Sequence, residues 1–201
     1  MSYSILFDMD GVLVDSEPVI NEAALRGLAE YGVHAKPEDF IPFVGTGEDL
    51  YIGGVSRKYN VPYQVEMKHR VYQIYLEIVS EKIKIFDGVL ELLLMLKEKG
   101  IKAALASSAD KVKIYANLKA ASIPVDLFEV IISGEDVVHK KPSPDIYLLA
   151  ADRIFEKYED CIVVEDALNG IVAAKAAGMK CIAVSTSFSA AELSKEEPDW
   201  I

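Results

Sequence analysis

The stretch ILFDMDGVLV, residues 5–14, decides the fold. It begins as an apolar run typical of a buried strand, and it ends on two carboxylates, Asp8 and Asp10, followed at once by Gly11. A carboxylate inside a buried strand has no solvent, so we expect both acids to emerge where the strand meets a crevice. Two acids this close repel unless a shared proton or a cation relieves them, and a divalent metal bound by oxygen ligands would do so. The alternative is that both aspartates only cap a turn or the next helix.

Composition sets the broad class. The chain has 201 residues, 51% of them hydrophobic and 26% charged, and its formal net charge is −11. This length predicts one full core plus a subdomain, and the acidic charge argues against nucleic acid or an anionic membrane as a partner. The N-terminus lacks the pattern of a signal peptide, and no apolar run approaches the roughly 20 residues of a membrane helix. We expect a cytoplasmic protein, a monomer by default, with Cys161 and Cys181 as buried reduced thiols.

Strand and helix patterns alternate through the second half of the chain. The expected strands are 101–106, 129–132, 161–164 and 180–184, and the expected helices are 89–99, 110–121, 144–154 and 169–177. This alternation predicts an α/β fold, a doubly wound parallel Rossmann-like sheet with helices on both faces. Residues 1–15 and 84–201 would form this core.

Residues 16–83 break the alternation. They contain no convincing strand, and apolar residues recur there at helical spacing, as at Met67, Val71, Ile74 and Ile78. We expect a small helical cap inserted after the first strand, with hinges near residues 14–16 and 82–87.

Polar side chains follow several strands. Ser107 follows the expected strand 101–106, and Glu165 and Asp166 follow the strand 161–164. Lys141 lies in the loop after the strand 129–132. Ligands in a doubly wound sheet bind beyond the carboxyl ends of the strands, where these groups would meet Asp8 and Asp10. Each residue alone could serve a cap, a turn or a solvated loop, but together they favour a functional site.

These residues resemble a known family. Asp8-x-Asp10-Gly11, Ser107, Lys141-Pro142-x-Pro144 and Glu165-Asp166-x-x-x-Gly170 match, in order and spacing, the four motifs of the haloacid dehalogenase-like hydrolases. The helical insert is similar to the cap of the subgroup that includes β-phosphoglucomutase and small sugar phosphatases. The resemblance covers essentially the whole chain.

The resemblance implies a catalytic role for each acid. Asp8 would be the nucleophile that forms an aspartyl-phosphate, and Asp10 the general acid and then the general base. Mg²⁺ would bind the Asp8 carboxylate, the Asp10 backbone carbonyl and Asp166, with Glu165 acting through a metal-bound water. The acid at position 10 points to phosphate rather than halide chemistry.

Other residues would hold the phosphoryl group. Lys141 would neutralise the nucleophile and the transferring oxygens, and Ser107, Ser108 and nearby backbone N–H groups would bind the phosphate. The substrate would be a small phosphorylated metabolite.

Hydrolysis and mutase chemistry differ in the segment that joins core and cap. β-Phosphoglucomutase carries a threonine and a histidine there, and the matching positions are Ser16 and Ile20. Ile20 cannot make a hydrogen bond, so we favour a phosphatase of small phosphomonoesters such as sugar or polyol phosphates. A β-phosphoglucomutase-type mutase is the alternative, and a non-catalytic binding domain is a third reading.

The cap would choose the substrate. The segment 43–48 resembles the cap loop that faces the site, where Gly45 would let the backbone approach a ligand and Glu48 could accept sugar hydroxyls. Lys68 or Arg70 could meet a second anionic group, although charged residues on a cap helix are usually just solvated. His69 and His139 are expected at the surface. Relatives usually continue past residues 198–201, which predicts an exposed sheet edge.

Overall fold

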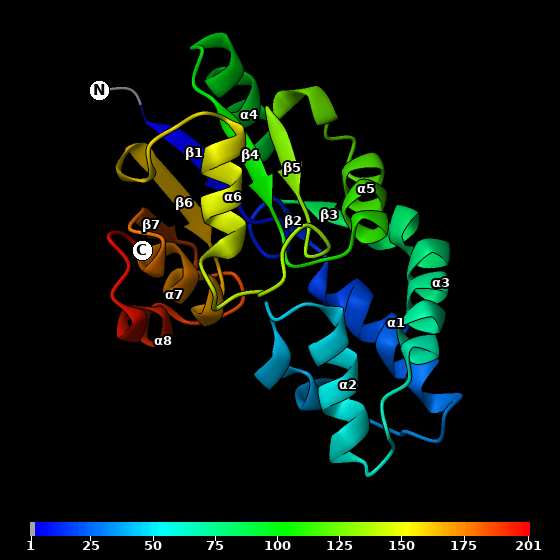
Figure 1. Cartoon of the computed structure of the whole chain (residues 1–201). Coiled ribbons are helices and arrows are strands. Elements are labelled where there is room, and N and C mark those ends of the chain that lie inside the picture. The colour runs from blue at the N-terminus through cyan, green and yellow to red at the C-terminus, as the bar shows by residue number, and fades with distance from the viewer. Residues whose placement is uncertain (1–2) are drawn as a thin grey trace.

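The core is a five-stranded parallel sheet. The computed structural model describes residues 3–201 and orders the strands β5-β4-β1-β6-β7 (Figure 1). Their bounds are β1 Ser4–Phe7, β4 Ala103–Ala106, β5 Val130–Ile132, β6 Cys161–Glu165 and β7 Lys180–Ala183. Ile5 pairs with Ala103 on one side and Ile162 on the other, so β1 is the central strand. The predicted doubly wound α/β fold is confirmed.

Helices cover both faces of the sheet. Helices α4 (Val89–Glu98) and α5 (Lys111–Ala120) pack on one face, and α6 (Asp145–Arg153) and α7 (Leu168–Ala176) on the other (Figure 1). The faces separate because alternate residues of a strand point to opposite sides: Leu6 packs with the α6–α7 layer and Phe7 with the α4–α5 layer. A short helix α8 (Ala190–Leu193) precedes the C-terminus. Cys161 and Cys181 are buried free thiols, as predicted.

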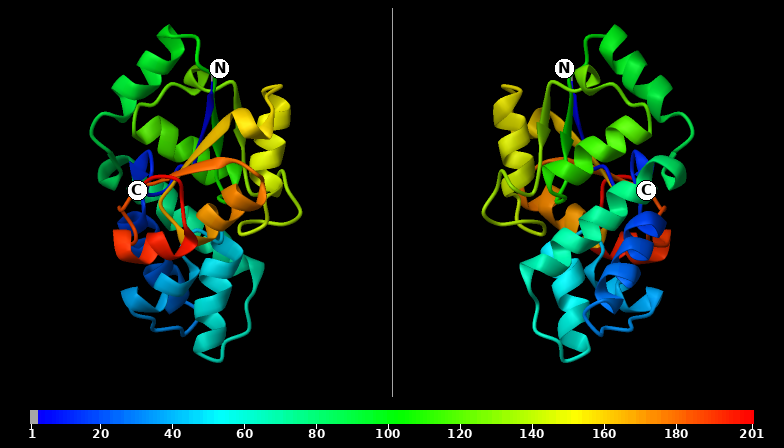
Figure 2. Two further views of the ribbon diagram at one scale, coloured as in Figure 1. Left: turned by 90° about the vertical axis from the view of Figure 1, so that its left-hand side faces the viewer. Right: turned by 90° about the vertical axis from the view of Figure 1, so that its right-hand side faces the viewer.

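The insert forms a helical cap with its own core. It contains α1 (Glu17–Ala29), two short 3-10 helices (Pro37–Asp39 and Ile41–Phe43), α2 (Glu48–Lys58) and α3 (Val65–Lys82). Leu28, Phe40, Met67 and Tyr75 are fully buried in its apolar cluster. Figure 2 shows these helices grouped at one end of the core, and the pocket described below lies between the two parts.

A small antiparallel ribbon joins the cap to the core. Strand β2 (Val14–Asp15) pairs with β3 (Lys84–Ile85), at the two positions expected to be hinges. The ribbon is absent from the sequence prediction because a two-residue strand leaves no periodic pattern. It brings the chain into and out of the cap at one place.

The C-terminal segment covers the edge of β7. The backbone carbonyl of Trp200 accepts a hydrogen bond from Ala183 N–H at 2.8 Å, and Cys181 N–H donates to the Asp199 carboxylate at 2.8 Å. The expected exposed edge is therefore wrong, because residues 199 and 200 satisfy part of it. No helix within residues 3–201 combines the length and apolar character that a membrane span requires.

Candidate active site

The turn after β1 places two aspartates at the mouth of one pocket. Asp8 is buried, and Asp8, Asp10 and Gly11 all line the pocket with Asp166 from the end of β6. Gly11 has a φ of +77°, and a Cβ at this position would lie 1.9 Å from Asp166 Oδ2. Only glycine fits, because any side chain would both strain the backbone and displace the Asp166 carboxylate.

A buried lysine neutralises the first aspartate. Lys141 Nζ lies 2.5 Å from Asp8 Oδ1 and 2.7 Å from Glu165 Oε1, and it also donates to the backbone carbonyl of Ala106 at 3.2 Å. The loop after β5 thus returns a cation to the carboxyl ends of β1 and β6. An ammonium this deeply buried is stable because it is paired and hydrogen-bonded.

Glu165 is a support for this lysine. Its Oε1 accepts from Lys141 and from Tyr147 O–H at 2.9 Å, and its Oε2 accepts from the backbone N–H groups of Asp166 and Ala167 at 2.8 and 2.9 Å. In this structure each Glu165 oxygen accepts two hydrogen bonds from the protein, so its visible role is to hold Lys141, and its action through a metal-bound water stays a prediction. Gly170 completes the motif: a Cβ there would lie 1.7 Å from Glu165 Oε1.

Burial dominates the electrostatics of the acids in the pocket. Burial raises the pKa of Asp8 to about 7, against the opposing effect of Lys141. Burial, together with the charges of Glu165 and Asp8, also raises the pKa of Asp166 well above its usual value. Burial favours neutral Lys141, but Asp8 and Glu165 raise its pKa above the usual value and keep it charged.

The donor set fits a hard divalent cation. Asp8 and Asp166 are buried carboxyl groups that line the same pocket, and oxygen ligands are what Mg²⁺ prefers. Within residues 3–201, no three side chains of the histidine, cysteine or acidic type converge as a ligand group. An ion here would therefore rest on these two carboxylates and complete its shell with backbone oxygen, water and substrate. Ser187 O–H donates to Asp166 Oδ2, a contact that the sequence did not predict.

Asp10 is held by three donors. Ser16 O–H and Asn117 Nδ2 donate to its Oδ1, the latter at 3.3 Å, and Lys113 Nζ donates to its Oδ2 at 2.9 Å. Lys113 and Asn117, both on α5, were not predicted from the sequence. Their signal was present: they share the buried face of α5 with Ile114 and Leu118, where apolar residues are the rule.

The end of β4 supplies two hydroxyls. Ser107 and Ser108 are buried and line the pocket. Ser107 Oγ accepts the N–H of Ala109 at 3.2 Å, while Ser108 Oγ is buried with no hydrogen-bond partner among the described residues. A buried hydroxyl without a partner next to two acids indicates a place for a polar ligand.

The cap loop closes over this pocket. Phe43, Gly45 and Glu48 line it, as expected for the segment 43–48. Gly45 comes so close to the core that a Cβ would lie 2.9 Å from the Cβ of Ala167. Glu48 begins α2 and is buried, and its Oε2 has no hydrogen-bond partner among the described residues.

Two further cap residues line the pocket without having been predicted. Tyr51 O–H donates to Glu17 Oε1 at 2.8 Å, so α1 and α2 present a linked hydroxyl and carboxylate to the site. Burial raises the pKa of Glu17. The cap side of the pocket therefore carries mainly acceptors.

The two cap cations expected near the substrate lie elsewhere. Arg70 forms an exposed ion pair with Glu30, at 2.8 Å from Nε to Oε2, and it is not among the pocket residues. A substrate contact by Arg70 is therefore wrong in this structure, because α3 turns that side chain toward α1. Lys68 pairs with Asp49 and Asp110 at 3.0 and 2.9 Å and so links cap to core.

Comparisons with known proteins agree with this geometry. The sequence profile described as "Haloacid dehalogenase-like hydrolase" matches residues 5–184. The chain is 44% identical to "Protein SUPPRESSOR OF QUENCHING 1, chloroplastic" of Arabidopsis thaliana, over 98% of this chain but only 19% of that longer protein. It is 35% identical to "Phosphorylated carbohydrates phosphatase" of Thermotoga maritima, over 89% of this chain and 83% of that protein.

A solved structure shares the whole fold. The structure of CbbY from Rhodobacter sphaeroides in complex with phosphate matches with a TM-score of 0.87 and 28% identity, over 100% of this chain and 93% of that chain. Core and cap are therefore both present in a phosphate-bound relative.

Proposed function

The chain belongs to the haloacid dehalogenase-like hydrolases, and we propose that it is a Mg²⁺-dependent phosphatase of small phosphomonoesters. The observation that carries the proposal is the contact of Lys141 Nζ with Asp8 Oδ1 at 2.5 Å, in the same pocket as Asp10. A nucleophile paired with a buried cation, beside a second acid, is the arrangement that two-step phosphoryl transfer needs.

The proposed reaction uses each acid in turn. An Asp8 carboxylate oxygen attacks phosphorus, and the bond to the leaving alkoxide breaks as Asp10 gives that oxygen a proton. Asp10 then takes a proton from water, whose oxygen attacks phosphorus and releases phosphate from the Asp8 carboxyl. Lys141 and the hydroxyls of Ser107 and Ser108 hold the phosphoryl oxygens. Mg²⁺, bound by Asp8 and Asp166, would offset the charge of the phosphoryl group.

The cap side of the pocket supports sugar or polyol phosphates as substrates. Glu17, Glu48 and Tyr51 offer hydrogen-bond acceptors to hydroxyl groups, whereas carboxylates would repel a second phosphate or a carboxylate on the leaving group. The Thermotoga maritima relative is by name a phosphatase of phosphorylated carbohydrates. Ile20, which is buried and lines the pocket, offers no hydrogen bond, which supports hydrolysis over mutase chemistry.

A phosphate-release panel tests the proposal. The panel contains glucose 6-phosphate, sorbitol 6-phosphate, phosphoglycolate, β-glucose 1-phosphate and p-nitrophenyl phosphate, each with and without Mg²⁺. We expect metal-dependent release that the Asp8→Asn variant abolishes, with the polyhydroxy substrates ahead of phosphoglycolate. Conversion of β-glucose 1-phosphate to glucose 6-phosphate with little free phosphate would establish the mutase instead. If none of these substrates is turned over, the chain would instead be a non-catalytic binding domain.

A further inference from the structure

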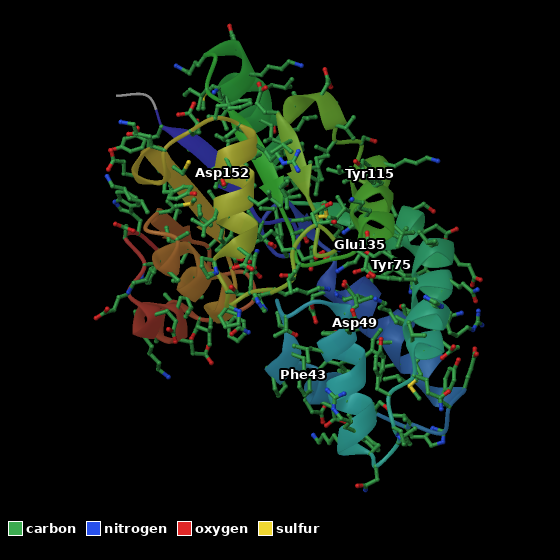
Figure 3. The ribbon with its side chains drawn as sticks, in the orientation of Figure 1. Phe43, Asp49, Tyr75, Tyr115, Glu135 and Asp152 are labelled. Carbon is green, nitrogen blue, oxygen red and sulfur yellow. The ribbon has the colours of Figure 1, made fainter. Side chains whose placement is uncertain are left out.

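Two chains of contacts run from the cap through α5 to Asp10. In the first, Glu48 Oε1 at the start of α2 lies 3.1 Å from Lys113 Nζ, which lies 2.9 Å from Asp10 Oδ2. In the second, Tyr75 O–H on α3 donates to Asn117 Oδ1 at 2.5 Å, and Asn117 Nδ2 donates to Asp10 Oδ1 at 3.3 Å. Figure 3 shows Tyr75 between α3 and α5.

The spacing on α5 makes this convergence possible. Lys113 and Asn117 are four residues apart, so they lie one above the other on the same face of the helix. One helix of the core thus carries two polar residues that each touch the cap on one side and the same carboxylate on the other. Both oxygens of Asp10 are addressed, one by each residue.

Packing alone gives no reason for these residues. The side chain of Lys113 is only 5% exposed, and burying an ammonium or an amide among apolar neighbours is unfavourable without partners. Their neighbours Ile114 and Leu118 supply the apolar contacts that hold α5 on the sheet. Both Lys113 and Asn117 instead contact Asp10 and a cap residue, and Asn117 also donates to the sulfur of Met9.

The cap contacts also restrict both α5 side chains. A lysine has four rotatable bonds, and the contact with Glu48 restricts the Lys113 ammonium to its position against Asp10. Tyr75 O–H occupies the amide oxygen of Asn117, and the NH₂ group of Asn117 donates to Asp10 Oδ1 and to the sulfur of Met9, each at 3.3 Å.

Resting on the phosphatase chemistry proposed above, we propose that Lys113 and Asn117 are positioning residues that orient the Asp10 carboxyl group, each held in place by a cap residue. Glu48 holds the Lys113 ammonium and Tyr75 holds the Asn117 amide, so these two cap residues contribute to the placement of Asp10 without touching it.

The test compares two leaving groups. An alkyl phosphate needs the proton from Asp10, whereas p-nitrophenolate leaves without one, so the ratio of their kcat/KM values measures how well Asp10 is placed. The alkyl substrate is the one that the panel shows to be hydrolysed fastest. Lys113→Met removes the ammonium and keeps the length of the chain. The Met variant loses charge near both dianionic substrates equally, and the ratio cancels that effect.

We expect the ratio to fall on the order of 10- to 100-fold in Lys113→Met, a part of the full general-acid contribution. Tyr75→Phe removes one hydrogen bond of about 1 kcal/mol and should lower the ratio roughly fivefold. Two matched controls lie on the outer surface of α5: Lys111→Met and Tyr115→Phe, whose parent side chains are exposed (Figure 3 labels Tyr115). Neither control should change the ratio.

A double variant tests the coupling to the cap. Once Asn117 is alanine, Tyr75→Phe should lower the ratio no further, because the hydrogen bond that it would remove is already gone, and Tyr75 does not line the substrate pocket. Additive effects of the two changes would contradict the coupling.

The outcomes are separable. An equal fall of both kcat/KM values in Lys113→Met shows a merely structural role and overturns the inference, as does an unchanged ratio. Retained hydrolysis of p-nitrophenyl phosphate shows that a variant is folded. Asp10→Ala is the reference: if it leaves the ratio unchanged in an active enzyme, the proposed acid role of Asp10 fails, independently of Lys113.

Discussion

Replacing Glu165 with glutamine distinguishes two roles for this residue: holding Lys141 in place, or acting on the metal ion. The carboxylate accepts four hydrogen bonds, two on each oxygen, from Lys141, Tyr147 and two backbone N–H groups. A glutamine amide has one oxygen and one NH₂ group. In either orientation the NH₂ group therefore faces two donors, and two hydrogen bonds are lost.

The expected size follows from those bonds. A hydrogen bond to a charged group contributes about 1.5 to 3 kcal/mol, so the Glu165→Gln variant should lose roughly 3 to 6 kcal/mol of folding stability. Lys141 loses its second negative partner in both orientations. If one such bond positions Lys141 against the phosphoryl oxygens, kcat should fall by about 10- to 150-fold.

The assay is a Mg²⁺ titration of turnover together with thermal unfolding. We expect the Mg²⁺ concentration for half-maximal activity to change by less than about threefold, because both Glu165 oxygens are engaged by Lys141, Tyr147 and backbone N–H groups. A carboxylate that acted on the ion or its bound water would change metal affinity by roughly 10- to 100-fold. A shift of that size, with unchanged thermal stability, would refute the reasoning. Glu159→Gln, at an exposed site, is the control.

Three further predictions follow from single features. Gly170→Ala should displace Glu165 and lower kcat about tenfold or more. The control is Gly32→Ala, at a φ of +78° with open space around it, which should lower the free energy of unfolding by about 1 to 2 kcal/mol without changing kcat. Hydrogen bonds from Lys58, Tyr59 and the Lys36 backbone hold the pKa of Asp39 below its usual value of 3.8, so Asp39 stabilises the cap above that pH and loses its effect as pH falls through and below it. The difference in melting temperature between the parent and Asp39→Asn should accordingly be largest at neutral pH and shrink in acid; a constant difference would contradict this ion pair. Mg²⁺ should relieve the repulsion between the buried carboxylates and raise the free energy of unfolding by about 2.7 kcal/mol at 100 times its Kd. The melting temperature should rise accordingly, and a chelator should reverse the rise.

The sequence predicts the core of the site well because that part is local to strand ends. Asp8, Ser107 and Asp166 each follow an apolar run, and parallel strands bring their carboxyl ends to one edge. The glycines of the motifs can also be identified from the sequence. The structure explains why they are glycines: Gly11 leaves room for the Asp166 carboxylate, and Gly170 leaves room for the Glu165 carboxylate.

The contacts between cap and core could not be read in the same way. Arg70 and Lys113 are both basic residues on helices. The Arg70 side chain points to α1 and solvent, whereas the Lys113 side chain is buried between two acids. Sequence periodicity gives the face of a helix and not the element that the face meets. A polar pair on an otherwise apolar face, as at Lys113 and Asn117, is the signal that such a contact exists.

Trapping of the phosphoenzyme with borohydride tests the central claim most directly. An acyl phosphate on Asp8 is reduced to homoserine, which mass spectrometry of the peptide carrying Asp8 detects. We predict homoserine at Asp8 only when a phosphate substrate and Mg²⁺ are both present, and none in Asp8→Asn. Steady turnover without homoserine at Asp8, or full activity of Asp8→Asn, would contradict the account.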